Sequence, residues 1–140
     1  MITTDISYKV IKIQLSFNKD ITLYLWDTLG SARYRHLVKL FLKDLDCVVI
    51  GFDITKKYSF EDAKVDFYHM IKDNNLCNLI YLIANKIDLY LYTQKEVDMK
   101  EAIEFAEKEN LRFFGISSRT GEGINEFFDD LILNLIYNKY

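Results

Sequence analysis

Two stretches between residues 6 and 27 alternate between apolar and polar positions, which is typical of strands that bury one face. The alternation runs from residue 6 to residue 15 but changes phase between Val10 and Ile11, which predicts a strand with a bulge at that point. A turn at 16–20 leads into a second alternating run at 21–27. Two such runs around a short turn predict an antiparallel hairpin.

The rest of the chain combines continuous apolar runs with stretches of helical periodicity. The runs 47–52, 79–84 and 113–116 predict parallel strands, and the first is expected to be covered on both faces. Ser59 and Asp98 fit the N-caps of the helices that follow the first two strands. The helical residues expected to face inward are Leu37, Leu40 and Phe41; Phe60, Ala63, Phe67 and Met70 or Ile71; Met99, Ala102, Ile103 and Ala106; and Ile124, Phe127, Phe128, Leu131 and Leu135.

This order of elements predicts an α/β sandwich of three layers, with helices on both faces of a mostly parallel sheet. Half of the 140 residues are hydrophobic and 15% are aromatic, so a single domain over 1–140 has enough apolar surface for a core. The net charge of −3 offers no electrostatic footprint for nucleic acid. Cys47 and Cys77 are too few for a disulfide framework or a zinc site, and they fit the reducing cytosol.

Membrane and secretory segments are not expected in this sequence. No apolar run reaches the ~20 residues of a membrane span. The first residues have neither the basic start nor the apolar run of a signal peptide.

The stretch 25–35 joins the end of a strand to a tight turn. Asp27 stands at the tip of the strand, where a carboxylate can face a metal ion, and Gly30 lets a backbone N–H approach an anion closely. The stretch reads Leu-Trp-Asp-Thr-Leu-Gly-Ser-Ala-Arg-Tyr-Arg and resembles the Trp-Asp-Thr-Ala-Gly-Gln-Glu-Arg-Tyr/Phe-Arg signature of Rab-type small GTPases in the Ras superfamily. Ser31 stands where that family has the glutamine that orients the attacking water, and a serine is too short to reach the same position.

Residues 85–88, Asn-Lys-Ile-Asp, follow the second apolar run and resemble the guanine-specifying Asn-Lys-x-Asp motif. The carboxylate of Asp88 can accept two hydrogen bonds side by side from N1–H and the exocyclic amine of guanine, and adenine has no such pair of donors. The stem of Lys86 can lie over the base, and Asn85 can tie neighbouring loops together. A polar loop that only caps a strand is the alternative.

A second loop follows the third apolar run. Ser117, Ser118 and Arg119 resemble the family's Ser-Ala-Lys loop, in which a backbone N–H reaches the guanine oxygen. A backbone donor tolerates Ser118 in place of alanine, whereas Arg119 keeps the charge of lysine but not its geometry.

Two further stretches resemble the family but are not assigned to the guanine base. Thr3 falls where the magnesium-binding threonine of the first switch segment lies, although an N-terminus without a ligand is an equal alternative. Asp53, Ile54 and Thr55, followed by Ser59, resemble an Asp-Ile-Thr run of Rab proteins. We expect that run to serve packing and capping, and we assign it no chemistry.

The resemblance extends from Thr3 to the last helix and implies the small-GTPase fold of the P-loop NTPases, with its first strand and helix missing. The sequence has no Gly-x-x-x-x-Gly-Lys-Ser/Thr loop and no cysteine at its C-terminus. We therefore expect weak binding of GTP, GDP and Mg²⁺, with Thr3 and Asp27 as the metal ligands, and no direct membrane anchor.

The function implied by the resemblance is a GTP/GDP-binding switch of vesicle traffic, impaired in this form. It would work in the cytoplasm, and at endomembranes if a longer prenylated form exists. Effector and regulator proteins would bind the hairpin at 3–15 and the switch-like segment at 31–42. Whether the chain hydrolyses GTP is left open, because Ser31 replaces the glutamine and the phosphate loop is missing. The alternative is a pseudo-GTPase, an interaction module without a nucleotide cycle.

Overall fold

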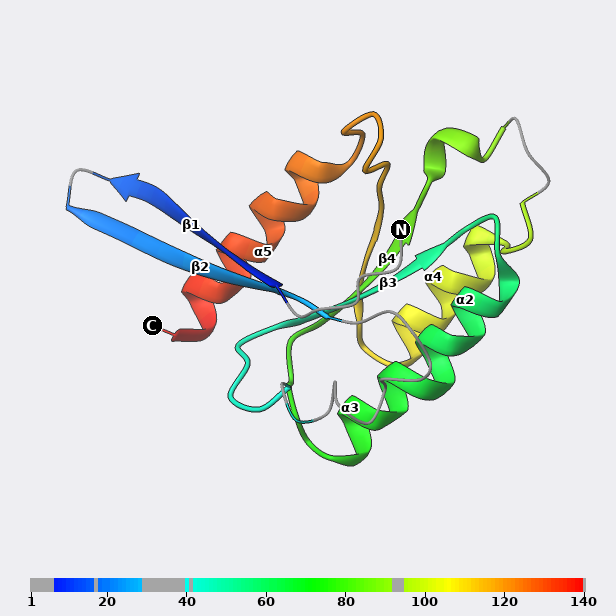
Figure 1. Ribbon diagram of the computed structural model, residues 1–140, viewed down its shortest axis with the longest axis horizontal. Helices are drawn as coiled ribbons and strands as arrows, with labels where there is room; N and C mark the ends of the chain where they lie inside the picture. The colour runs from blue at the N-terminus through cyan, green and yellow to red at the C-terminus, as the bar shows by residue number, and fades with distance from the viewer. Residues whose placement is uncertain (1–6, 17, 29–39, 41, 92–94, 140) are drawn as a thin grey trace. The chain divides into compact units, whose positions relative to one another are not determined.

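The computed structural model describes residues 7–16, 18–28, 40, 42–91 and 95–139 (Figure 1). The chain divides into two compact units, Met1–Lys43 and Asp44–Tyr140. Each unit is described by itself.

The first unit holds an antiparallel hairpin of β1 (Ser7–Ser16) and β2 (Lys19–Asp27), as the alternating pattern predicts. The expected bulge near Val10 and Ile11 is wrong, because pairing is regular there and the register shifts only between Gln14 and Ser16. The change of phase arises because apolar residues stand first on one face of a regular strand and then on the other. The short helix expected near 37–41 falls almost entirely outside the described residues.

The second unit is built on a parallel sheet of β3 (Val48–Asp53), β4 (Ile80–Asn85) and β5 (Arg112–Gly115), in that order. Each strand lies within a residue of its predicted range. The register pairs Asp53 with Asn85, so the two polar strand ends lie side by side.

The helices form layers on the two faces of this sheet (Figure 1). One face is covered by α4 (Met99–Lys108) and by a continuous helical stretch made of α2 (Lys57–Asp62), the π-helical η2 (Ala63–Tyr68) and α3 (His69–Asp73). The other face is covered by α5 (Ile124–Lys139). A short 3-10 turn, η3 (Ile87–Leu89), follows β4. The predicted α/β architecture, with a parallel sheet and an N-terminal hairpin, is confirmed.

Apolar residues on alternate positions of the strands fill the two cores. Toward α2 and α4, the ring of Phe52 lies 4.8 Å from that of Phe60, and the rings of Phe60 and Phe105 form a T-shaped pair. Toward α5, a buried cluster joins the two later strands to the helix; its members are Tyr81, Ile83, Ile116, Phe127 and Leu131. These contacts fix the strand ends at which the polar loops begin.

The expectation that β3 is covered on both faces is wrong. Its Val48, Ile50 and Phe52 are buried, but Val49 on the opposite face is 46% exposed. The cluster beneath α5 contains side chains of β4 but not Val49. A continuous apolar run therefore does not reveal which strand the neighbouring helix covers.

The stretch from Lys57 to Asp73 departs from the predicted helix in two ways. Ser59 is not the N-cap, because the helix begins at Lys57 after an N-cap residue, Lys56, that makes no side-chain cap. Phe60, Ala63 and Ile71 are buried as expected, but Tyr68 is buried where Phe67 was expected. The wider π-helical turn explains this shift, because it brings residues five apart onto one face.

The helix α4 follows its prediction more closely. The Asp98 side chain accepts a hydrogen bond from the backbone N–H of Lys100, as an N-cap does, and Ala102 and Ala106 are buried. Ile103 is 39% exposed, so its predicted inward position is wrong. It follows Ala102 by a single position, which rotates it by ~100° away from the buried face.

Candidate functional site

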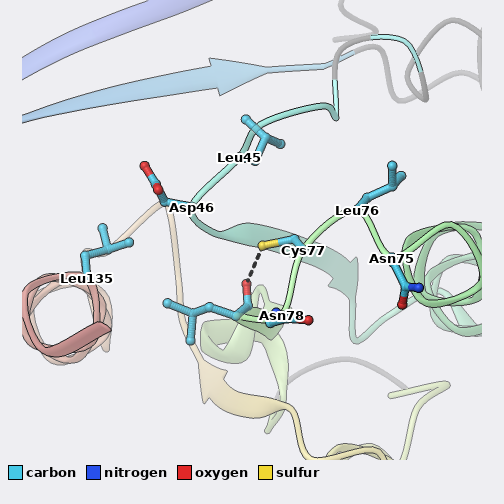
Figure 2. A pocket seen from close by; sticks show the side chains of 8 residues that line it. Leu45, Asp46, Asn75, Leu76, Cys77, Asn78 and Leu135 are labelled. Atoms are coloured by element: carbon cyan, nitrogen blue, oxygen red, sulfur yellow. Dashed lines mark hydrogen bonds between the residues drawn. The ribbon is translucent and has the colours of Figure 1, made fainter. Parts of the chain in front are cut away.

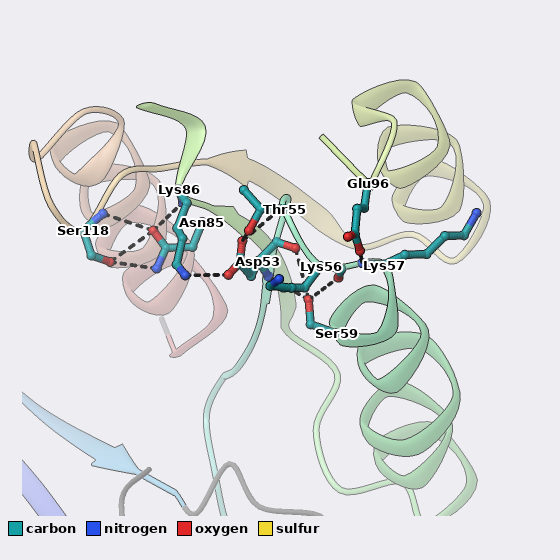
Figure 3. Close-up of polar contacts among 9 residues, drawn as sticks. All are labelled: Asp53, Thr55, Lys56, Lys57, Ser59, Asn85, Lys86, Glu96 and Ser118. Carbon is teal, nitrogen blue, oxygen red and sulfur yellow. Dashed lines mark hydrogen bonds and ion pairs between the residues drawn. The ribbon is translucent and has the colours of Figure 1, made fainter. Parts of the chain in front are cut away.

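Several polar residues of the second unit lie at the carboxyl ends of its strands, where parallel sheets bind ligands. Asp53 ends β3, Asn85 ends β4, and Ser118 lies in the loop after β5 (Figure 3). Two backbone hydrogen bonds hold the loops after β4 and β5 together: Ile116 N–H donates to Ala84 O over 2.8 Å, and Ile87 N–H donates to Ile116 O over 3.2 Å.

Asp88 is oriented by a buried serine. Ser117 has no exposed surface, and its Oγ donates a hydrogen bond of 2.7 Å to Asp88 Oδ1. The same Oγ accepts a hydrogen bond from the backbone N–H of Thr120 over 3.1 Å, so the hydroxyl is fixed on both sides. A carboxylate offers about four acceptor positions, and this contact leaves its others available.

Asn85 ties the loop after β4 to the loop after β5 (Figure 3). Its Nδ2 donates to Ser118 Oγ over 3.0 Å, and its Oδ1 accepts from the backbone N–H of Ser118 over 3.1 Å. Oδ1 also accepts from the backbone N–H of Lys86 over 2.8 Å. The Ser118 N–H, which the resemblance assigns to the guanine oxygen, thus donates to Asn85 in this structure.

Lys86 makes a contact that the sequence did not reveal. Its Nζ lies 2.5 Å from Asp53 Oδ2, and the lysine side chain is 50% exposed whereas that of Asp53 is 19% exposed. Burial acts to raise the pKa of the Asp53 carboxyl, but hydrogen bonds from Lys86 and Thr55 outweigh it and bring the pKa below its ordinary value. The one sign of this contact in the sequence was the position of the residues, because Asp53 and Asn85 end adjacent parallel strands.

The loop that carries Ser117 is closed by its own backbone. Ser117 N–H donates to Glu122 O over 2.9 Å, and Gly121 N–H donates to Ser117 O over 2.8 Å. Gly123 has a φ of +75°, and a Cβ at that residue would lie 2.3 Å from the carbonyl oxygen of Gly115. A glycine is therefore required where this loop passes over the end of β5.

Comparison with known proteins shows the family to which the chain belongs. The family model described as Ras family matches residues 1–137. The chain belongs to the Ras family. It is 34% identical to Ras-related protein Rab-5B of Plasmodium falciparum over 131 residues, which is 91% of this chain and 59% of that protein.

Further relatives give the same result. Ras-related protein Rab-2B of Dictyostelium discoideum is 34% identical over 112 residues, covering 80% of this chain and 54% of the relative. GTP-binding protein ypt5 of Schizosaccharomyces pombe is 32% identical over 111 residues, covering 79% and 52%. The chain is a Rab-type small GTPase domain, and it spans little more than half the length of these relatives.

The residues that the resemblance assigns to the phosphates and the metal belong to the first unit of the chain. Thr3, Gly30 and Ser31 lie outside the described residues. Asp27 ends β2 in the first unit and is exposed. Within the described ranges, no group of three or more acidic, histidine or cysteine residues could hold a metal ion. Arg119 is exposed beside Ser118.

A hollow of about 560 Å³ lies near the amino ends of β3 and β4, away from these loops (Figure 2). Cys77 points into this region with its Sγ 3.4 Å from Leu79 O, and burial raises the pKa of its thiol. Cys77 and Cys47 are both free, and burial raises the pKa of Cys47 to about 12. Protonated thiols of this kind are poor nucleophiles, so neither cysteine is assigned a chemical role.

Proposed function

We propose that this Rab-type domain binds guanine nucleotides, with Asp88 as the residue that selects the base. The observation that supports this most strongly is the bond from buried Ser117 to Asp88 Oδ1. It holds a carboxylate in place at the ligand-binding end of the sheet without using up its acceptor capacity. Guanine presents two adjacent donors to such a group, and adenine does not.

The other base contacts are assigned to the same edge of the sheet. Asn85 holds the two loops together through Ser118, and the stem of Lys86 supplies an apolar surface for the face of the base. For the backbone N–H of Ser118 to reach the guanine oxygen, it has to leave Asn85 Oδ1. Arg119 adds positive charge beside the base.

GTP and GDP are the proposed ligands, with Mg²⁺ bound at the phosphates. Carboxylate oxygen is the kind of donor that Mg²⁺ takes, and the exposed Asp27 at the end of β2 offers one. Thr3 is the second proposed metal ligand, Gly30 the proposed phosphate contact, and Ser31 stands at the position of the water-orienting glutamine. When bound, the metal would neutralise phosphate charge.

The proposed role is a switch in vesicle traffic, in the cytoplasm and at endomembranes, read by effector and regulator proteins. Within the described residues, no helix is long and apolar enough to cross a membrane. One face of the hairpin supports protein binding, because Tyr8 and Tyr24 are 62% exposed and Trp26 is 51% exposed. The rings of Tyr8 and Trp26 lie 5.1 Å apart and form a common apolar surface. The segment 31–42 is the second proposed contact.

A pseudo-GTPase that binds partners without a nucleotide cycle is the second candidate. It is favoured by the same exposed aromatic face and by the engagement of Lys86 and the Ser118 N–H within the protein. Nucleotide binding separates the two candidates. Titration with GDP and ADP should give clear preference for GDP if the first is correct, and no binding of either if the second is correct.

A further inference from the structure

We propose that Asp53 is a positioning residue of the guanine site, which anchors the ammonium group of Lys86 so that the lysine stem forms a fixed wall for the base. This inference rests on the proposed function. From the sequence, the run from Asp53 to Thr55 is expected to serve only packing and capping. The 2.5 Å ion pair between Asp53 Oδ2 and Lys86 Nζ gives Asp53 a further role.

Asp53 is held rigidly from several sides. Its Oδ1 accepts hydrogen bonds from the backbone N–H of Thr55 over 2.9 Å and from Thr55 Oγ1 over 2.7 Å. Its own backbone N–H donates to Ser59 Oγ over 3.0 Å, in the first turn of α2. The carboxylate is therefore a fixed point, and Oδ2 is the oxygen that faces Lys86 (Figure 3).

Lys86 is held at its other end as well. Its backbone has a φ of +67°, a left-handed conformation that is uncommon for lysine, and its N–H donates to Asn85 Oδ1 over 2.8 Å. With the backbone and the ammonium group both fixed, the four-carbon stem between them has little freedom. It runs from the end of β4 toward the end of β3 (Figure 3). A restrained stem loses less conformational entropy when a base packs against it.

The two acidic residues thus have separate tasks. Asp88 is fixed from the β5 side by Ser117 and is proposed to read the edge of the base. Asp53 acts from the β3 side, through Lys86, on the face of the base. Loss of Asp53 should consequently weaken binding of every base that packs on the stem and leave the choice among bases unchanged.

The experiment compares GDP and inosine diphosphate, which lacks the exocyclic amine, on the unaltered chain and on Asp53→Asn. The asparagine keeps an oxygen for Thr55 but loses the charge that holds Lys86. Because partly exposed ion pairs contribute up to ~1 kcal/mol, both Kd values should rise about threefold to fivefold, and their ratio should not change. Glu104→Gln, which removes the charge of an exposed acid on α4 that pairs with Lys100, is the matched control and should bind as well as the unaltered chain.

Lys86→Met separates positioning from a structural role. It keeps an apolar stem but has no ammonium group, so Asp53→Asn should cause no further loss of GDP affinity in that background. An equal loss in both backgrounds, an unchanged Kd for Asp53→Asn, or a changed GDP to inosine diphosphate ratio would overturn the inference. If Asp53→Asn does not fold, Lys86→Met alone must show the same loss with the same ratio. Failure of the unaltered chain to bind GDP would instead overturn the proposed function, and this inference with it.

Discussion

Ser117 Oγ donates a 2.7 Å hydrogen bond to Asp88 Oδ1 and so joins the loop after β5 to the turn after β4. Among the residues that the structure describes, Ser117 is the buried polar residue of the core, and its hydroxyl is shared between Asp88 and the Thr120 N–H. The residue proposed to select the base is therefore held by the packed interior of the sheet, not by the surface loop alone.

Replacing Ser117 with alanine should remove the support of Asp88. The variant should lose ~1–2 kcal/mol of unfolding free energy and bind GDP about tenfold more weakly, because the carboxylate is left to reorient. Denaturant unfolding and GDP titration measure the two effects. Ser118→Ala, which removes a neighbouring exposed hydroxyl, should change stability less; equal effects from both variants would contradict the special role of Ser117.

Gly123 and Gly121 provide a matched pair for the loop above β5. Both have positive φ, but a Cβ at Gly123 would meet the Gly115 carbonyl oxygen at 2.3 Å, whereas a Cβ at Gly121 would meet open space. Gly121→Ala should cost ~1 kcal/mol from its backbone conformation alone. Gly123→Ala should cost at least ~2–3 kcal/mol, because the backbone must also move. Equal melting temperatures for the two variants would show that the contact with the Gly115 carbonyl oxygen does not affect the free energy of unfolding.

The first turn of α2 should depend on Ser59 although it is not a cap. Its hydroxyl accepts from Asp53 N–H and donates to a backbone carbonyl, with Lys56 O at 2.7 Å. Ser59→Ala should therefore destabilise the protein by ~1–2 kcal/mol. This is as much as the loss expected from Asp98→Ala, which removes the side chain that caps α4. Chemical denaturation compares the two variants, and a neutral Ser59→Ala would contradict the assignment.

Stability should fall in acid because the carboxylates of Asp53, Glu109 and Asp130 are ionised and paired in the folded chain. Hydrogen bonds from Arg112 hold the pKa of Asp130 below its ordinary value, and hydrogen bonds from Tyr68 and Lys72 do the same for Glu109. A lowered folded-state pKa contributes stability above the ordinary value, and that stability is lost as pH falls through the folded value. Melting temperatures should thus decrease below about pH 4.5. Asp130→Asn should be less stable at neutral pH and should show a shallower decrease; an equally steep decrease would contradict the assignment.

The sequence predicted most of the sheet because its signals are local. Buried strands stand out as apolar runs, and Asn85 and Asp88 follow one of them in a motif of adjacent residues. The hairpin was equally clear, but the bulge near Val10 was not real, because a strand with two apolar faces gives the same change of phase as an inserted residue. Pattern alone cannot separate these two cases.

The ion pair between Asp53 and Lys86 lay beyond the reach of the sequence for a different reason. The two residues are far apart in the chain and come together only through the register of β3 on β4. The π-helical turn that buries Tyr68 depends likewise on packing against the sheet, since no residue in 63–68 signals a wider turn. Contacts set by register and tertiary packing are not encoded in local periodicity.

Guanine selection by Asp88 can be tested by the binding of diphosphates to the unaltered chain and to Asp88→Asn. The unaltered chain should prefer GDP to ADP. Asp88→Asn should weaken GDP by about tenfold to a hundredfold and should favour xanthosine diphosphate relative to GDP, because an acceptor becomes a donor. Asp129→Asn, an exposed acid on α5, is the control and should bind as the unaltered chain does. Equal affinity of the unaltered chain for GDP and ADP, or an Asp88→Asn variant with unchanged preference, would show that Asp88 does not select guanine.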